Sequence, residues 1–225
     1  MKKTTIQFGT FILFALATLT FTACQKDLLS GHGSTITEVR TLSDFQKVMV
    51  SGKPDVQIIK SNESKIEVTG YANLVSAYRT DVSNGQLRAD YRNATVIRND
   101  NISLKIYTKD LSLVDVSGKV EVDIFGAFSG DHFTAKLSGD TRLKVNDNAT
   151  YQSVRFELSG LSRVFAKNIA AQEASASCSG ETLIELTASQ KLTVNISGKS
   201  DVHYWGNPAN VEEHISGLGK LFRRQ

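Results

Sequence analysis

Hydrophobic and polar residues alternate strictly along much of the second half of the chain. One parity of the stretch from 133 to 145 carries Phe133, Ala135, Leu137, Gly139, Thr141, Leu143 and Val145, whereas the other is polar or charged. The same phase returns at 154–166 and at 192–204. A period of two is that of a strand with one buried face, not of a helix. The pattern therefore predicts β-strands that each turn one face toward a core.

These alternating stretches are copies of one repeat, marked by a hydrophobic residue followed by Ser-Gly. Six copies follow one another at intervals of 18–21 residues, with their glycines at Gly118, Gly139, Gly160, Gly180, Gly198 and Gly217. A fixed period of roughly 20–50 residues indicates stacked units that share a continuous core. Glycine costs stability inside a strand, so its recurrence predicts a bend where an inward-facing side chain has no room. Each repeat should be two short strands joined at a corner and followed by a turn.

The outward-facing residues indicate how the repeats stack. When the copies are aligned, Asp115 lies beside Lys136, Lys136 beside Glu157, and Glu121 beside Arg142. Neighbouring strands about 4.8 Å apart favour such opposite charges. We therefore expect an all-β fold, a right-handed parallel β-helix (β-solenoid) of ~20-residue rungs, with its handedness set by the crossover rule for parallel strands.

The first half of the chain carries strand patterns without the tight repeat. Val50-Ser51-Gly52 is an early copy of the repeat motif, and Ser83-Asn84-Gly85-Gln86 separates two strand-like runs. Asn-Gly between such runs is a strong hairpin signal. The sequence predicts one β-helical domain over 44–225, in which further strands and one hairpin at 44–110 precede the Ser-Gly rungs at 111–225.

The N-terminal segment has the pattern of a secretion signal. Lys2 and Lys3 precede an uncharged apolar stretch at 8–23, which is shorter than the ~20 residues of a membrane-spanning helix. The stretch ends Phe21-Thr22-Ala23-Cys24 and resembles the lipobox of bacterial lipoproteins, in which small residues precede the cysteine that receives the lipid. The alternative is an ordinary secretory signal with an unmodified cysteine.

On this basis we expect residues 1–23 to be a lipoprotein signal peptide and Cys24 to be lipidated. The polar stretch after it has no steady periodicity, so 24–43 is predicted to be a flexible tether. Loss of residues 1–23 removes two lysines and lowers the net charge from +3 to +1, which gives no electrostatic case for nucleic acid. Cys178 takes an inward position of the repeat and is expected to be a core residue without a disulfide partner.

The strongest candidate site lies late in the chain. Asp201, His203 and Trp205 share one face, and Glu185 lies beside His203 in the preceding repeat. Tryptophan can stack on a sugar ring while a carboxylate accepts hydrogen bonds from its hydroxyls. The alternative is a ladder of ion pairs with an aromatic residue covering the turn. The outward acids alternate with bases rather than cluster for acid/base catalysis, and no histidine has metal-ligand spacing, so we expect no catalytic residues, metal or cofactor.

Three further stretches carry a resemblance to a known family: Phe45–Gly52 with Asp55-Val56 after it, Gly85-Gln86-Leu87, and Tyr204–Pro208 ahead of the last Ser-Gly copy. With the rungs between them, they resemble the head GIN domain family of bacterial auto-transporter adhesins. The proline that commonly precedes the first rung is missing, and Lys109-Asp110 stands in that stretch. The resemblance implies a β-helical surface or periplasmic protein of Bacteroidota type and carries over no catalytic residues.

We therefore expect a non-catalytic cell-envelope lipoprotein of the outer membrane that acts as an adhesin or surface-binding module. The expected partners are the membrane, through the lipid anchor, and a host or envelope glycan or protein, but no nucleic acid. Gln25-Lys26-Asp27 resembles the tag that sends some Bacteroidota lipoproteins to the cell surface. The alternative function is a carbohydrate-active β-helix enzyme or a glycan-binding lectin of the envelope that uses the Asp201–Trp205 region.

Overall fold

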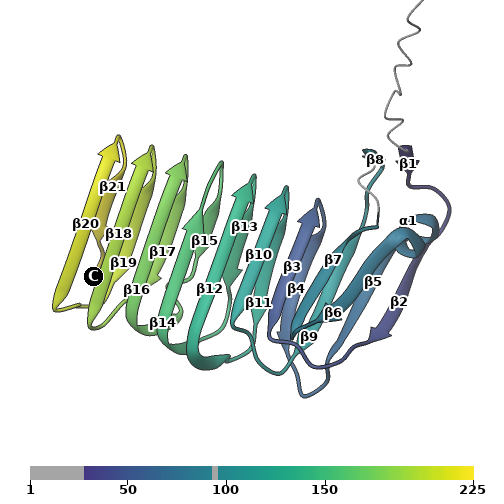
Figure 1. Ribbon diagram of the computed structural model, residues 1–225, viewed down its shortest axis with the longest axis horizontal. Helices are drawn as coiled ribbons and strands as arrows, with labels where there is room; N and C mark the ends of the chain where they lie inside the picture. Colours follow the sequence, from purple (N-terminus) through teal and green to yellow (C-terminus); the bar gives the residue numbers. More distant parts are fainter. Residues whose placement is uncertain (1–27, 93–95) are drawn as a thin grey trace, which may run out of the picture.

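The computed structural model describes residues 28–92 and 96–225 of the chain. Within them the protein is built almost entirely of strands, with one short helix, α1 (Ala72–Ala77), and it forms a β-solenoid (Figure 1). The predicted signal peptide, Cys24 and the surface tag at 25–27 lie outside the described residues.

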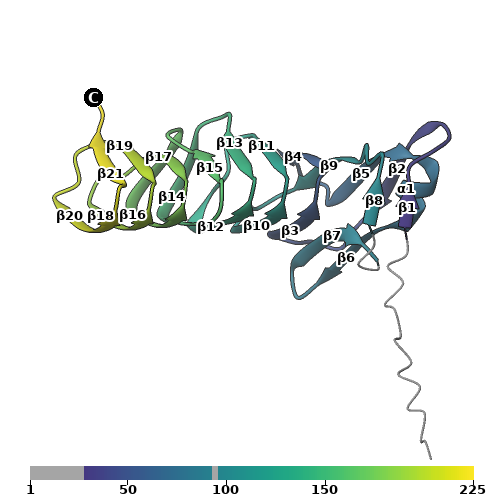
Figure 2. The same ribbon diagram turned by 90° about the horizontal axis from the view of Figure 1, so that it is seen from above.

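Each Ser-Gly rung consists of two strands that meet at a corner, as predicted. The rungs are β10 (Leu113–Gly118) with β11 (Glu121–Phe125), β12 (Ser129–Gly139) with β13 (Arg142–Val145), β14 (Ala149–Leu158) with β15 (Arg163–Phe165), β16 (Ile169–Gly180) with β17 (Leu183–Thr187), β18 (Lys191–Gly198) with β19 (Asp201–Trp205), and β20 (Asn210–Gly217) with β21 (Lys220–Arg223). The strand before each corner joins the first sheet and the strand after it joins the second sheet. The two sheets face each other across the core (Figure 2).

The strand register confirms the predicted charge ladder. Asp115 pairs with Lys136 and Lys136 with Glu157 in the first sheet, whereas Glu121 pairs with Arg142 in the second. The Lys136 Nζ–Glu157 Oε2 distance is 2.9 Å and the Arg142 Nη1–Glu121 Oε2 distance is 3.8 Å. Parallel pairing in register therefore brings side chains about 20 residues apart in sequence into direct contact.

The corner glycines stand where the sequence predicts a bend, but their expected inward orientation is wrong. Gly139 is exposed, with a φ of 98°, and a Cβ built on it would collide with the backbone oxygen of Gly118. Glycine is needed here because the backbone is left-handed and adjacent rungs stack backbone against backbone. The inward position after the corner belongs to Thr141, whose buried hydroxyl hydrogen-bonds Ser162 Oγ at 2.9 Å.

The inward rows of both sheets form one continuous apolar core. Phe133 and Phe156 are among its largest fully buried side chains. Cys178 lies between Leu158 and Ile196 in the same row and is 4% exposed, which confirms it as a core residue. Burial raises the pKa of its thiol, so the thiolate form that reacts with oxidants and metals is disfavoured.

The early motif Val50-Ser51-Gly52 belongs to a further rung of the solenoid. This rung is β3 (Lys47–Gly52) with β4 (Asp55–Lys60), and Ser51 and Gly52 pair with Ser117 and Gly118. On the other side of it, β7 (Gln86–Tyr91) pairs in parallel with β3, and β9 (Ser103–Thr108) with β4. The segment between β4 and β10 therefore extends the solenoid away from the Ser-Gly rungs before the chain returns to begin them.

Irregularly ordered strands and one helix close this end of the molecule, which we call the cap. It comprises α1 and β7 with β1 (Leu28–Ser30), β2 (Thr35–Thr41), β5 (Lys65–Tyr71), β6 (Tyr78–Ser83) and β8 (Val96–Arg98). The hairpin of β6 and β7 is confirmed, and its turn residues Asn84 and Gly85 have φ values of 52° and 69°. The cap lies opposite the end formed by β20 and β21 (Figure 1).

From residue 28 onward the structure contradicts the expected flexible tether. β1 pairs with β8, and β2 pairs along its whole length with β5. Most residues of β2 are exposed because it is the edge strand of the second sheet. A strand without a buried face has no apolar parity, so its sequence carries no period-two signal.

Candidate functional site

The predicted cluster of Asp201, His203, Trp205 and Glu185 lies on the outer face of the second sheet. Glu185 and His203 are paired neighbours on β17 and β19, as the sequence predicts. The His203 ring packs edge-on against Phe222, with ring centroids 5.0 Å apart. Arg224 Nη2 lies 3.4 Å from both ring nitrogens of His203. Residues of the last rung thus lie against this histidine.

Trp205 and Asp201 also lie close to side chains of other rungs. The Lys167 ammonium lies 5.8 Å from the centroid of the Trp205 ring, a distance at which a cation interacts with an aromatic face. Asp201 is paired with Lys220 on the last rung. The cluster is therefore a patch of side chains packed on one another along the sheet, and glycan binding by it stays a prediction.

A hollow lies on the outer face of the first sheet, beside the corners. It has a volume of about 680 Å³, and we call it the serine groove. Its side chains come from two outward rows: Asp115, Lys136, Glu157, Ser177, Asn195 and His214 in one, and Ser138, Ser159, Ser179, Ser197 and Ser216 in the other. The groove crosses the strands of six successive rungs.

Side-chain size gives the groove its shape. In the middle of the row, Ser177 and Asn195 are short, whereas the strands on one side carry the Lys136–Glu157 ion pair and the strand on the other side carries His214. Identical backbone stacking places all of these side chains at the same height above the sheet, so short residues make a floor and long residues make flanks.

The serines of the groove are ordered by the preceding rung. Ser179, Ser197 and Ser216 donate to the backbone oxygens of Leu158, Cys178 and Ile196 at 3.5, 3.4 and 3.3 Å. A hydroxyl that donates in this way keeps its oxygen lone pairs for another donor. These bonds go to carbonyls rather than to a base, so they leave the serine oxygens able to accept hydrogen bonds but do not activate them as nucleophiles.

Asp115, in the outward row of the groove, has a carboxyl group whose pKa is raised. Burial raises its pKa, while the Lys136 ammonium opposes that shift and Glu157 adds to it. The carboxyl group therefore holds its proton to a higher pH than an exposed aspartate does.

The groove continues into a second hollow on the same face. That hollow, of about 500 Å³, shares Ser177 and Asn195 with the serine groove and adds Ser175 and Thr193 from the next outward row. Arg155 lies 3.6 Å from Glu157 at its margin. The alternating sequence pattern predicts polar residues at these outward positions but not a hollow. Its signal is the run of short polar residues at successive outward positions of β16 and β18.

Two classes of feature are absent from the part of the chain that the structure describes. Residues 28–92 and 96–225 contain no group of three or more His, Cys, Asp or Glu side chains placed to hold a metal ion. In the same residues, no helix has both the length and the apolar character needed to cross a membrane.

Comparison with known families identifies the repeat domain. The family described as "Putative auto-transporter adhesin, head GIN domain" matches residues 44–208. The chain belongs to this family. The head GIN domain thus includes the β3–β4 rung and the Ser-Gly rungs as far as the turn after β19. The resemblance expected from Phe45–Gly52 and Tyr204–Pro208 is confirmed.

Solved structures share the fold of this head GIN domain. A "putative adhesin" from Bacteroides fragilis is 17% identical with a TM-score of 0.70, and the match covers 87% of this chain and all of that one. A "putative adhesin" from Parabacteroides merdae and a "putative lipid binding protein" from Parabacteroides distasonis are each 18% identical with TM-scores of 0.56, covering 88% of this chain and all of theirs. At such identities the likeness establishes the fold alone. No curated protein matches the sequence.

Proposed function

We propose that this head GIN protein is a non-catalytic binding module of the cell envelope, anchored by a lipid on Cys24, that presents the serine groove to an external ligand. The observation that carries the proposal is the groove itself, which crosses six rungs with ordered hydroxyl acceptors along one wall. The family description as an adhesin supports a role in binding.

Binding is favoured over catalysis because the reactive groups of the groove are engaged with one another. Glu157 forms an ion pair with Lys136, with 2.9 Å between Oε2 and Nζ, and the serines donate hydrogen bonds to backbone oxygens. A hydrolase of glycans needs two carboxyl groups facing each other across the bond that breaks. The groove instead has Asp115 and Glu157 on strands two rungs apart, with Lys136 between them.

The groove fits an extended glycan better than a compact ligand. Its row of serines, Ser138, Ser159, Ser179, Ser197 and Ser216, recurs at successive rungs about 4.8 Å apart, so a chain of similar units lying across the strands meets a hydroxyl at each step. Sugar hydroxyls donate to serine and carboxylate oxygens, and the Asn195 side chain offers both a donor and an acceptor. An envelope or host glycan is therefore the ligand class that we propose first, ahead of a protein segment.

A groove-filling substitution tests this proposal. Ser177→Arg places a long side chain on the floor of the groove, so we expect glycan binding, measured on an array and then by calorimetry, to weaken at least tenfold. Ala127→Arg is the matched control, because Ala127 is exposed in the turn after β11, away from the groove. Equal binding by wild type and Ser177→Arg, or cleavage of a bound glycan, would contradict the proposal.

The same array separates the two glycan-binding candidates. Trp205→Ala removes the aromatic ring of the Asp201–Trp205 patch and leaves the serine groove intact. If Trp205→Ala abolishes binding while Ser177→Arg does not, the ligand belongs to the second sheet and the lectin alternative replaces the groove.

The lipid anchor has a test of its own. A lipidated cysteine is the membrane attachment that the N-terminal sequence predicts once the signal is removed. Metabolic labelling with a fatty acid should mark the wild-type protein and leave Cys24→Ala unlabelled. Equal labelling of both proteins would exclude Cys24 as the attachment point.

A further inference from the structure

The cap contains a hollow of opposite electrostatic character to the serine groove. It has a volume of about 540 Å³ and lies between β7, β8 and the corner of β3 and β4. We call it the arginine pocket. Its charged lining residues are Lys53, Arg79, Arg88, Arg92, Asp90 and Asp100, four cations and two carboxylates, so the lining carries a net charge of +2.

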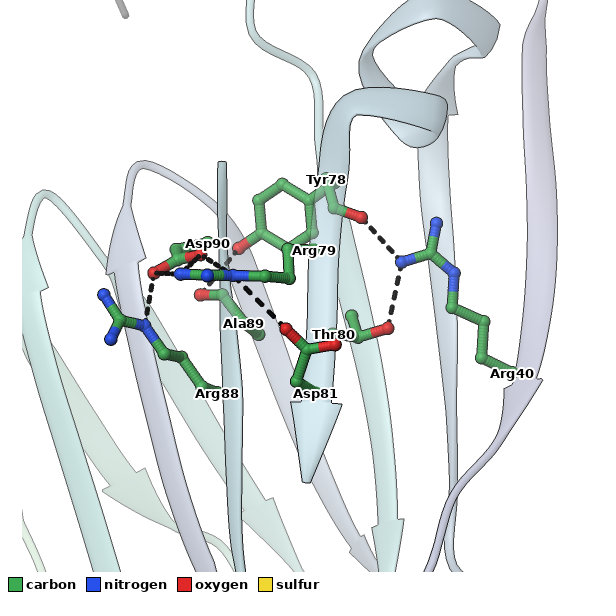
Figure 3. Close-up of polar contacts among 8 residues, drawn as sticks. All are labelled: Arg40, Tyr78, Arg79, Thr80, Asp81, Arg88, Ala89 and Asp90. Atoms are coloured by element: carbon green, nitrogen blue, oxygen red, sulfur yellow. Dashed lines mark hydrogen bonds and ion pairs between the residues drawn. The ribbon is translucent and has the colours of Figure 1, made fainter. Parts of the chain in front are cut away.

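A buried carboxylate holds two of the arginines in place (Figure 3). Asp90, whose side chain is 10% exposed, accepts hydrogen bonds from Arg79 Nη2 on both oxygens at 2.8 and 2.9 Å. Arg88 Nε donates to Asp90 Oδ2 at 2.7 Å. Arg79 Nε also lies 3.4 Å from Asp81 Oδ2. The two carboxylates balance the two arginines, and Lys53 and Arg92 leave an excess of positive charge over Asp100 in the lining.

The second carboxylate of the pocket is also occupied within the protein. Asp100 Oδ1 accepts from the Tyr91 hydroxyl at 2.7 Å and from the Ile102 amide at 3.2 Å. Burial and this hydrogen bond to Asp100 raise the pKa of Tyr91, so its hydroxyl stays protonated and continues to donate. Asp100 is therefore engaged by its own chain.

Arg88 lines the pocket and has hydrogen-bond donors without a partner among the described residues. In the described part of the chain it donates a single hydrogen bond, from Nε, and its side chain is 57% exposed. Its two Nη groups form the planar fork that binds two oxygens of a phosphate or carboxylate. Arg40 in the same cap differs, because its Nη groups are used by Tyr78, Thr80 and Val75.

The pocket lies where the chain enters the fold. Val96 and Ile97 of β8 line it, and Leu28 of β1 pairs with Val96. Leu28 and Val96 are 56% and 45% exposed, so two apolar side chains stand together beside the cations. Leu28 follows Cys24 by four residues, which span at most about 14 Å.

We propose that the arginine pocket binds the phosphate of an anionic lipid headgroup in the membrane that carries the anchor. This step rests on the proposed lipidation of Cys24, which brings the cap rather than the β20–β21 end to the membrane surface. The Arg88 fork accepts the phosphate, Lys53 and Arg92 add attraction, and Leu28 and Val96 contact the apolar boundary beneath the headgroups. The serine groove then points away along a solenoid oriented by its cap.

Vesicle binding by the unlipidated chain tests the proposal. A chain from residue 25 onward keeps every described element. In flotation assays it should bind vesicles of phosphatidylcholine with phosphatidylglycerol, and bind vesicles of phosphatidylcholine alone far more weakly. Arg88→Gln should lower the partition coefficient about fivefold, the factor for one basic residue at an anionic surface, because Arg79 still holds Asp90. Arg163→Gln, which removes an exposed arginine from the second sheet, is the matched control and should change little.

The outcomes separate this inference from the proposed function. Binding that ignores lipid charge, or falls equally in both variants, overturns the headgroup site. Competition by millimolar inorganic phosphate without any binding to anionic vesicles assigns the pocket to a small soluble anion instead and also overturns it. Fatty-acid labelling tests the anchor and the glycan array tests the groove. A negative result in either assay does not change what the vesicle assay says about the arginine pocket.

Discussion

The Ser-Gly rungs and the cap are stabilised in different ways. In the rungs, each strand pairs in parallel with a nearly identical strand, and the corners stack glycine backbone on glycine backbone. In the cap, the β2–β5 and β6–β7 pairs are antiparallel, and side chains complete the backbone hydrogen bonding. Arg40 donates to the backbone oxygen of Tyr78 at 2.7 Å and to Thr80 Oγ1 at 3.0 Å (Figure 3). It also donates to the backbone oxygen of Val75 at 2.9 Å.

The comparison shows that a repeat supplies hydrogen-bond partners for its own backbone, whereas the end of the repeat needs partners from side chains. Every rung is a template for the next, so few particular side chains are needed beyond apolar residues inside and glycine at the corner. Where the repeat stops, the backbone groups of α1 and β6 need other partners, because an unpaired buried carbonyl costs about 1–3 kcal/mol. One arginine from the edge strand β2 donates to two of these carbonyls. The rungs therefore depend on repeated backbone geometry, and the cap depends on single side chains.

The largest expected effect is on the rungs, at a corner. Gly139→Val places a β-branched side chain at a φ of 98° and against the backbone of Gly118. The strain and the overpacking together should lower the free energy of unfolding by roughly 2–5 kcal/mol. Denaturant unfolding followed by circular dichroism measures this loss.

Ser138→Val is the matched control, one residue away. Ser138 is exposed, so the substitution should change the free energy of unfolding by no more than about 0.5 kcal/mol. Equal losses from the two variants would contradict the argument that backbone stacking at the corner, rather than bulk in that region, limits the sequence.

A smaller effect is expected in the cap, from Arg40→Met. The Arg40 side chain is 18% exposed. Methionine retains its apolar stem but removes the donor to the Tyr78 carbonyl and one of the two donors to the Val75 carbonyl, which still accepts from the Tyr78 amide. The free energy of unfolding should fall by about 2 kcal/mol. Amide exchange should quicken first in α1 and β6, while the amides of β14 and β16 keep their protection.

Arg40→Lys sharpens the same comparison. Lysine keeps the charge but cannot reach both carbonyls with a planar fork, so its stability should lie between those of wild type and Arg40→Met. If lysine restores wild-type stability, charge near Glu38 matters more than the forked hydrogen bonds.

The rungs could be predicted from sequence because their two signals agree. The alternation of apolar and polar residues correctly placed Leu137 and Leu158 on the inward face, and the Ser-Gly period predicted which residues pair. The orientation of Gly139 was predicted wrongly because side chains alternate between two faces only while the backbone is extended, and at the corner it is not. The strand β2 was missed because an exposed edge strand has no alternation of apolar and polar residues. The role of Arg40 was missed because its partners, two backbone oxygens and the Thr80 hydroxyl, lie 35 to 40 residues away in sequence.

The candidate sites were predictable only as far as residue type allowed. Sequence brought Glu185 and His203 together correctly, since pairing follows from the repeat. It did not show that Phe222 and Arg224 lie against His203, nor that short residues between longer ones form the serine groove. A hollow depends on the relative heights of neighbouring side chains, which a list of polar positions does not express.

The smallest expected effect concerns Asp115, on the first Ser-Gly rung after β3. Its pKa is raised, chiefly by burial, so the folded state binds its proton more tightly than the unfolded state does. Stability from this group therefore falls as pH rises through the interval above the usual aspartate pKa. Asp115→Asn has no carboxylate to ionise and should be slightly more stable than wild type at pH 7, with the difference shrinking toward pH 3.

Denaturant unfolding of both proteins between pH 3 and 7 measures that difference. Subtraction of the two curves cancels the other acids of the chain, which titrate in both proteins. The sign of the stability difference is informative because burial raises the pKa of Asp115 while the Lys136 ammonium lowers it. An asparagine variant less stable than wild type at pH 7 would show that the Asp115–Lys136 pairing outweighs the burial. The charge ladder would then contribute to rung stacking at this position, and the rungs, like the cap, would depend on a particular side chain.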